Sequence, residues 1–310
     1  QITKNQNVIG FDGNIEKFNK IKILQKKLGK DIKIKPVSPN LIDLIWKNSP
    51  KKLISSPFKL PLNFHGEEKS LKIKKIIRYI ETSKKDACIL TSCDTICWLF
   101  NIRAQDLEYS PLIMAKSIIH RDGSCFIFSD QKTLKNETLN SKIKIIYKPL
   151  HHFDSHFNEY KDSIGSYLCA PNDTSFNVVM LIKEIGAKVI FKDNIVDILK
   201  AKKNTTEENG MRNAHIRDGV ALTKFIYWIK KTKNNSQTEI SASNYLYKLR
   251  SKNENFFSLS FPTIAGSGPN GAIVHYRASN KTNRKLKKDD LFLVDSGAQY
   301  FDGTTDVTRT

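Results

Sequence analysis

Two apolar periodicities alternate along this chain and constrain its fold more than any other feature. Apolar runs short enough for β-strands recur in its middle part, at 87–90, 96–100, 112–119, 125–128, 143–147 and 188–191. Apolar residues at helical spacing lie between some of these runs, notably over 176–185, where Gly186 ends the helical pattern. Strands that alternate with helices in this way predict an α/β domain built around a central sheet.

Beyond a boundary near 200–204, a long helical pattern is followed by strands. Thr205 and Glu208 have the spacing of a capping box, and apolar residues recur at helical spacing over 211–229. A second, shorter helix is predicted over 238–249. Strands are predicted at 256–264, 272–276 and 291–298, with a tight loop at 266–271. This part of the chain therefore reads as a domain of its own.

The first 66 residues mix both kinds of element. The sequence predicts a strand at 8–12, a helix over 14–28 that Gly29 ends, a short helix at 41–46 and a proline-containing linker at 55–64. A basic amphipathic helix over 67–83 then opens the middle domain. A length of 310 residues favours two domains or more. We expect a mixed α/β (α+β) fold with domains at 1–66, 67–200 and 201–310.

The net charge of +20 would suit a nucleic-acid-binding protein, but the type of basic residue argues against one. Only nine of the 51 basic residues are arginine, and the lysines are scattered, as over 20–35 and 69–85, instead of clustering with aromatic residues. Proteins that read phosphates and bases favour arginine. We therefore expect solvated lysine faces and no nucleic-acid partner.

Other compositional features favour a cytoplasmic protein. The sequence contains no run of 18 apolar residues, and its start at Gln1 lacks the basic-then-apolar pattern of a signal peptide, so we expect no membrane association. Five irregularly spaced cysteines without a CxxC pair predict neither a disulfide framework nor a zinc knuckle. The chain lacks an initiator methionine and stops inside a Thr/Val-rich run, so we expect a fragment of a longer protein.

Two aspartates lie at the ends of a predicted β-hairpin near the end of the sequence. Asp295 follows a four-residue apolar run, and Asp306 lies in the Thr/Val-rich run. Aspartate is disfavoured inside strands, so each of them needs an explanation. A bound metal ion is one explanation, and an exposed face of the hairpin is the other.

The register of the hairpin decides whether the two aspartates can share a metal site. A two-residue turn at Asp302-Gly303 would pair Gln299 with Asp306, which leaves Asp295 four positions away on the same face. The resulting separation of about 13 Å is too large for one site. A turn nearer Phe301, with a bulge, would shorten it without changing the face.

A histidine and several smaller clusters are further candidates. His275 lies on the predicted strand after a Gly-Pro-Asn-Gly loop, where it could donate to a substrate carbonyl or move a proton, or could be a half-buried structural histidine. The cluster of His151, His152, Asp154 and His156 is better explained by loop composition, and His215 by a helix surface. Cys93 and Cys97 are assigned no chemistry, because their β-rich neighbours predict a core strand over 94–101.

Several segments together match a known pattern. They are Ser260-Phe261-Pro262-Thr263-Ile264, the run from Gly268 to Tyr276, the run from Val294 to Tyr300, and the run from Asp302 to Thr310. With weaker segments at 202–218 and 98–103, they resemble the aminopeptidase P (Xaa-Pro aminopeptidase) family of the pita-bread metallopeptidase superfamily. The resemblance implies two creatinase-like α/β domains, the first incomplete at its N-terminus, followed by the opening part of a pita-bread catalytic domain.

The resemblance also implies roles for three residues. Asp295 would bind one metal ion, Asp306 would bridge two, and His275 would contact the substrate or assist proton transfer. Three further ligands, one His and two Glu, and a second active-site histidine would lie beyond Thr310. We therefore expect this chain by itself to be inactive.

The implied activity is the metal-dependent release of the first residue from peptides with proline at position two. Hard carboxylate ligands favour two Mn²⁺ ions, with Zn²⁺ or Co²⁺ as alternatives, and a homodimer is compatible with the family. A metal-free creatinase-like relative is one alternative, against which Asp295 and Asp306 argue. A non-catalytic binding protein for acidic partners on the same fold is the other.

Overall fold

The computed structural model describes residues 7–50, 53–231 and 237–310, so the start of the chain, where we expect no signal peptide, lies outside the described residues. The chain divides into two compact units. The first consists of 1–59, 67–106 and 112–202, and the second of 60–66, 107–111 and 203–310. The three-domain division expected from the sequence stays a prediction.

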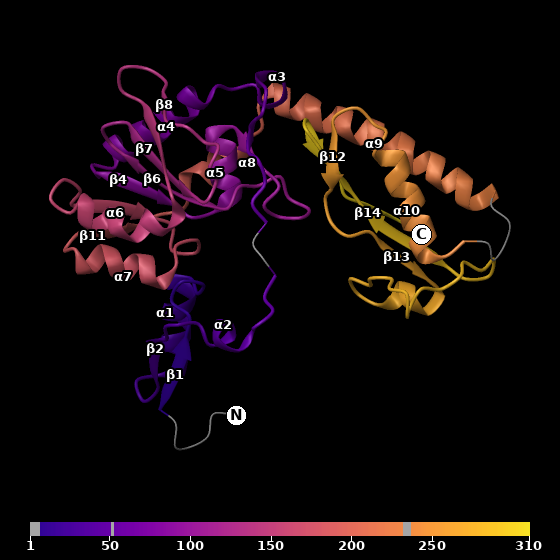
Figure 1. Ribbon diagram of the computed structural model, residues 1–310, viewed down its shortest axis with the longest axis horizontal. Coiled ribbons are helices and arrows are strands. Elements are labelled where there is room, and N and C mark those ends of the chain that lie inside the picture. The colour runs from indigo at the N-terminus through magenta and orange to yellow at the C-terminus, as the bar shows by residue number, and fades with distance from the viewer. Residues whose placement is uncertain (1–6, 51–52, 232–236) are drawn as a thin grey trace. The chain divides into compact units, whose positions relative to one another are not determined.

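The first unit is built on a seven-stranded mixed sheet with strand order β11-β10-β4-β6-β7-β9-β8 (Figure 1). Its strands are β4 (Ala87–Leu90), β6 (Ala115–His120), β7 (Ser124–Ser129), β8 (Glu137–Thr138), β9 (Lys144–Lys148), β10 (Ser166–Cys169) and β11 (Lys188–Phe191). Strands β4, β10 and β11 run parallel, whereas β6 is antiparallel to both β4 and β7. Because β4, β6, β7 and β10 are covered on both faces, nearly every residue in them is buried.

Helices cover both faces of this sheet. They are α4 (Lys69–Thr82), α5 (Cys93–Phe100), α6 (Phe153–Glu159), α7 (Phe176–Glu184) and α8 (Ile195–Ala201), with a short 3₁₀ helix η1 (Leu150–His152). One apolar cluster joins α4, α5 and α8 to one face of the sheet, and a second joins α6 and α7 to the other. The α/β architecture predicted from the alternation is confirmed for this unit.

The beginning of the chain adds small elements to the first unit. They are β1 (Val8–Phe11), α1 (Phe18–Leu28), β2 (Lys33–Pro36), α2 (Leu41–Ile45), β3 (Phe58–Lys59) and β5 (Ile102–Arg103). Strands β1 and β2 pair in parallel, and Phe18 of α1 stacks on Phe176 and Phe191. Helix α1 ends at Gly29, as the sequence predicts, where φ is 78°.

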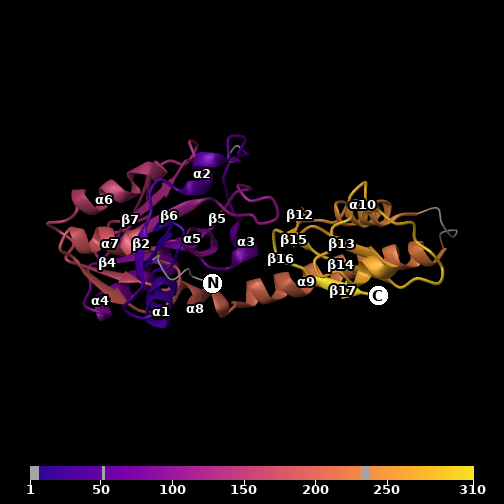
Figure 2. The same ribbon diagram turned by 90° about the horizontal axis from the view of Figure 1, so that it is seen from below.

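The second unit combines two long helices with short antiparallel sheets. Its elements are α3 (Leu62–His65), α9 (Thr205–Lys231), α10 (Glu239–Arg250), β12 (Phe256–Leu259), β13 (Ile264–Ser267), η2 (Gly268–Ala272), β14 (Phe292–Ser296), β15 (Ala298–Tyr300), β16 (Gly303–Thr304) and β17 (Val307–Arg309). The sheets have strand orders β12-β15-β16 and β13-β14-β17. Helices α9 and α10 pack on one face of the strands, as Figures 1 and 2 show.

A buried ion pair fastens the two helices of the second unit to strand β15. Arg250 of α10 donates two parallel hydrogen bonds to Asp218 of α9, each 2.8 Å long. The Tyr300 hydroxyl of β15 donates a third, also 2.8 Å long. The Arg250 side chain has no exposed surface and that of Asp218 only 3%, so this contact is fully desolvated.

Several local predictions from the sequence are wrong. Residues 93–100 form helix α5, not a strand, and strand β10 was not predicted. The predicted strand at 256–264 is interrupted between β12 and β13, and 272–276 forms the end of η2 and a turn. The capping box at the start of α9 joins Asn204 to Glu207, one residue earlier than predicted, through two reciprocal 3.0 Å hydrogen bonds.

The cysteines and the helices bear on two expectations about the chain as a whole. All five cysteines are free thiols. Within the described residues, no helix combines the length and the apolar character needed to cross a bilayer.

Candidate active site

Asp295 and Asp306 lie on neighbouring strands of the second unit. Asp295 is in β14 and is paired with Thr308 of β17, while Asp306 directly precedes β17. Asp306 is therefore two positions from the residue opposite Asp295. Such diagonal neighbours are about 7–8 Å apart on one face of a sheet, close enough for both carboxylates to reach a shared site.

This register corrects the one that Asp302-Gly303 suggested. The loop between β15 and β16 consists of Phe301 and Asp302, because Tyr300 pairs with Gly303 and Gln299 with Thr304. The same register continues into β14 and β17 without the bulge that an earlier turn was expected to need. The alternative with a turn near Phe301 is thus the one observed.

Close packing against α9 explains why Gly303 belongs to a strand and not to the turn. A Cβ atom on Gly303 would lie 2.9 Å from the Ala214 Cβ and 3.1 Å from the Met211 Cα. On the helix, a Cβ atom on Gly210 would lie 2.3 Å from the Asp302 carbonyl oxygen. The two glycines therefore let helix and hairpin approach each other.

Alternation along the strands identifies the face on which both aspartates lie. Val294 packs on Leu222 and Phe225 of α9, and further along the chain the Tyr300 hydroxyl binds Asp218 of the same helix. Residues with even numbers in this stretch thus face the helices, and Asp295 faces the opposite side. On β17, Val307 joins the helix-side cluster, so Asp306 and Thr308 face the same side as Asp295. We call this side the open face.

The two carboxylates keep most of their acceptor capacity. Asp295 is half-buried and accepts a 2.8 Å hydrogen bond from the Thr308 hydroxyl. Asp306 is exposed, and no hydrogen bond or ion pair of its carboxylate occurs among the described residues. Two hard oxygen donors that form no ion pair among the described residues are a donor set that fits a divalent metal ion.

His275 lies on a loop instead of the predicted strand. It follows η2, which contacts β13 and β14, and its side chain is exposed. Its φ of 55° is in the left-handed region, which a residue other than glycine rarely adopts. Its neighbour Tyr276 is buried, and burial together with the Glu239 carboxylate raises the pKa of the Tyr276 phenol.

Sequence reasoning missed a segment that borders the open face. Gln299 lies on this face, where the Thr304 hydroxyl donates to its side-chain oxygen over 2.6 Å. The Gln299 amide donates over 3.1 Å to the backbone carbonyl of Tyr109, in the segment 107–111. Burial and a hydrogen bond with the Glu108 carboxylate raise the pKa of the Tyr109 phenol, and the positive charge of Arg277, two residues after His275, partly opposes this shift. Gln299 and Tyr109 are 190 positions apart, so no local sequence pattern predicts their contact.

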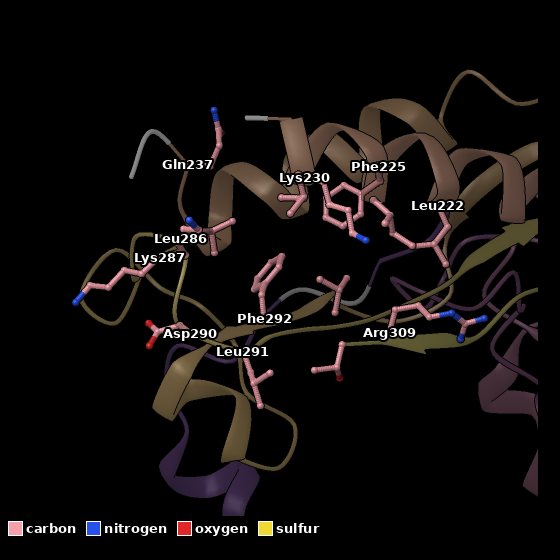
Figure 3. A pocket seen from close by; sticks show the side chains of 15 residues that line it. Leu222, Phe225, Lys230, Gln237, Leu286, Lys287, Asp290, Leu291, Phe292 and Arg309 are labelled. Carbon is pink, nitrogen blue, oxygen red and sulfur yellow. The ribbon is translucent and has the colours of Figure 1, made fainter. Parts of the chain in front are cut away.

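A pocket of about 750 Å³ lies on the other side of the strands (Figure 3). Its lining includes Leu222 and Phe225 of α9, Phe292 and Val294 of β14, and Arg309. It is mainly apolar and does not contain Asp295, Asp306 or His275. We therefore place the candidate active site on the open face, where the carboxylates are, and not in this pocket.

The remaining candidates do not join this site. His215 is exposed on α9 and donates from Nδ1 to the Met211 carbonyl, as expected for a helix-surface residue. His156 is buried in the first unit, where its Nε2 lies 3.1 Å from the Nε2 of His120. Cys97 is buried in α5, and burial raises the pKa of its thiol to about 11. Across the described ranges, no three His, Cys, Asp or Glu side chains form a group that could hold a metal ion.

The sequence matches two protein families. Residues 48–207, about half of the chain, match the family described as Creatinase/Prolidase N-terminal domain. Residues 209–310 match metallopeptidase family M24. The second match contains His275, Asp295 and Asp306, whereas the first covers most of the seven-stranded unit.

Curated relatives share most of this chain. A probable Xaa-Pro aminopeptidase P from Laccaria bicolor is 32% identical over 312 residues, which cover 97% of this chain and 48% of that protein. The Xaa-Pro aminopeptidase ApepP of Drosophila melanogaster is 30% identical over 310 residues, covering 97% of this chain and 50% of the relative. The chain thus spans about half the length of the curated relatives it matches.

Solved structures agree with the sequence comparison. The X-prolyl aminopeptidase from Caenorhabditis elegans, described as a cytosolic enzyme with a di-nuclear active site, superposes with a TM-score of 0.89 at 29% identity, over 99% of this chain and 51% of that chain. The prolidase from Pyrococcus horikoshii, at 19% identity and a TM-score of 0.57, covers 77% of this chain and 64% of that one and shares the fold. The chain therefore belongs to the creatinase/prolidase N-terminal family, with a family M24 metallopeptidase region after it, and both the expected fold class and the resemblance to aminopeptidase P are confirmed.

Proposed function

We propose that the protein containing this sequence is a metal-dependent Xaa-Pro aminopeptidase, which releases the first residue from peptides with proline at position two. The observation that carries this proposal is the pair of carboxylates on the open face. In a chain with 51 basic residues, Asp295 and Asp306 face the same side and form no ion pair among the described residues. Two neighbouring negative charges repel each other, and a bound cation would compensate this repulsion.

Each of the three site residues has a proposed role. Asp295 and Asp306 would supply carboxylate ligands to a site for two divalent ions, and hard oxygen donors favour Mn²⁺ over softer choices such as Zn²⁺ or Co²⁺. When bound, such ions acidify a water molecule and polarise the peptide carbonyl. The Thr308 hydroxyl donates to Asp295 and so fixes the orientation of that carboxylate.

His275 acts on the substrate side of the site. Its exposed imidazole can donate a hydrogen bond to the carbonyl oxygen of the residue that is released, or can transfer a proton at the leaving nitrogen. Peptide substrates and a cytoplasmic location are parts of the same proposal, supported by the relatives named above.

The role of Asp306 is testable by a change that keeps its size. In the protein containing this sequence, Asp306→Asn should lower the rate of Xaa-Pro cleavage by more than about 100-fold, because a ligating charge is removed. Titration calorimetry should show weaker Mn²⁺ binding in the same variant. Asp289→Asn, at an exposed carboxylate of the same unit, is the matched control and should change neither quantity.

Two results would contradict the proposal. Turnover that survives complete removal of metal by a chelator would indicate the metal-free creatinase-like alternative. Absence of Xaa-Pro cleavage in the metal-loaded wild type, together with salt-sensitive binding of acidic partners, would indicate a binding protein instead.

A further inference from the structure

A buried carboxylate lies behind the loop that carries His275. Glu239, the first residue of α10, has no exposed surface. Its Oε1 accepts hydrogen bonds from the Ser267 backbone N–H over 2.8 Å and from the Asn270 side-chain amide over 3.0 Å. Its Oε2 accepts from the Tyr276 hydroxyl over 2.8 Å and from the Arg284 backbone N–H over 2.9 Å. A desolvated carboxylate requires such donors, and here four different residues supply them.

These four donors bracket His275 along the chain. Ser267 and Asn270 precede it, at the end of β13 and within η2. Tyr276 follows it directly, and the Asn270 amide also donates to the Tyr276 hydroxyl over 2.8 Å. The two sides of the loop therefore meet at one carboxylate, although Glu239 itself does not belong to the loop.

The backbone at His275 needs such an anchor. Its φ of 55° is a left-handed conformation that costs energy for any residue with a Cβ atom. Such a conformation persists where the surrounding contacts determine it, and strained residues of this kind cluster at functional sites. Tyr276, one residue further on, has only 6% of its surface exposed, whereas His275 itself is exposed.

We propose that Glu239 is a positioning residue for His275, holding the loop in the left-handed backbone conformation that keeps the imidazole exposed. Glu239 does not touch the substrate and acts through Tyr276 and Asn270. Its importance for turnover rests on the proposed function, because it depends on the role of His275. Its importance for the conformation of the loop does not.

Glu239→Gln is the informative change, since it keeps the size of the side chain. In Glu239→Gln an amide NH₂ group replaces one of the two acceptor oxygens. This NH₂ group would face N–H and O–H donors, so the loop should lose some of its hydrogen bonds to residue 239. Tyr276→Phe removes a single hydroxyl and leaves the ring packed, and it serves as the second variant if Glu239→Gln does not fold. Ser241→Ala is the matched control, because Ser241 belongs to the capping box of the same helix end and its side chain hydrogen-bonds to Thr238 and Gln237, outside the loop.

The first readout does not require catalysis. NMR spectra of the imidazoles, assigned with a His275 variant, should show a shift of the His275 ring signals in Glu239→Gln and Tyr276→Phe. Ser241→Ala should leave these signals unchanged even if it lowers the melting temperature. Unshifted His275 signals in both loop variants would overturn the proposal.

The second readout is the turnover of Xaa-Pro peptides by the protein containing this sequence. A misplaced imidazole should lower kcat by about 100-fold with little change in KM, whereas Ser241→Ala should leave both unchanged. A fall in activity shared equally by Ser241→Ala would mean that Glu239 acts through stability alone, and the proposal would fail. If the wild type cleaves no Xaa-Pro peptide, the proposed function fails, while the NMR result still decides whether Glu239 positions the loop.

Discussion

Removal of the charge at Asp218 should unfold the second unit more readily than any change on its surface. Asp218 accepts two hydrogen bonds from Arg250 and one from the Tyr300 hydroxyl, each 2.8 Å long. Asp218→Asn keeps the shape but leaves the Arg250 guanidinium uncompensated in a site with no exposed surface. Removing one partner of a buried ion pair typically costs about 3–5 kcal/mol. We expect Asp218→Asn to lower the free energy of unfolding of the second unit by this amount.

A surface pair of the same chemistry provides the matched control. Arg212 and Glu208 are one helical turn apart on α9, at 3.4 Å, and their side chains are 67% and 50% exposed. Such pairs contribute about 0.3–0.5 kcal/mol. Glu208→Gln should therefore lower the free energy of unfolding by roughly a tenth of the amount expected for Asp218→Asn.

Native-state hydrogen exchange is a suitable assay, because it reports the free energy of opening for each helix separately. The amides of α10 should exchange faster in Asp218→Asn by a factor that corresponds to about 3–5 kcal/mol. The double change of Asp218→Leu with Arg250→Met should recover much of this loss, since neither partner is left charged. A loss in Asp218→Asn no larger than in Glu208→Gln would refute the reasoning.

Two further predictions concern the first unit and the border of the open face. Burial lowers the pKa of His120 to about 4 and that of His156 to about 3, so the unfolded chain binds more protons as pH falls below its histidine pKa of about 6.5. This contribution to the stability of the first unit should therefore be complete above about pH 6.5 and decrease as the pH falls towards the folded-state values, and a urea midpoint that stays constant over this range would contradict the prediction. Gln299→Leu should release the segment 107–111 from β15 and increase its cleavage by a protease, whereas Gln25→Leu, which removes side-chain hydrogen bonds to the Gly29 and Ile32 carbonyls in the first unit, should not.

The central sheet was largely predictable from sequence because burial on both faces leaves uninterrupted apolar runs. Strand β10 was missed, since its apolar run is only Tyr167-Leu168-Cys169, directly after Gly165-Ser166. Helix α5 was predicted as a strand because it contains residues that favour strands and because its apolar residues lie on all sides of the helix. A helix buried against the sheet has such a sequence, and six of its eight residues are buried. Asn101, with a φ of 54°, ends it in a conformation that sequence reasoning did not anticipate.

The candidate site shows what local signals can and cannot give. The face shared by Asp295 and Asp306 follows from strand alternation, and the sequence was sufficient to predict it. Their separation depends on the register, and the glycine of Asp302-Gly303 misled the prediction because helix packing, not turn geometry, requires it. The hydrogen bonds of Glu239 to the His275 loop join residues up to 45 positions apart and have no local signature.

The contact between Gly210 and the hairpin has a mechanical consequence. The first turns of α9 are held from the other side by residues 60–66: the Asn204 amide donates to the His65 carbonyl over 2.8 Å, and a Cβ atom on Gly66 would lie 2.6 Å from Thr206. A helix wedged between two backbones has little freedom to slide or tilt. A displacement of residues 60–66 would therefore displace α9 as well. Through α9 it would move the strand that begins one residue after Asp306, and so change the distance between the Asp295 and Asp306 side chains.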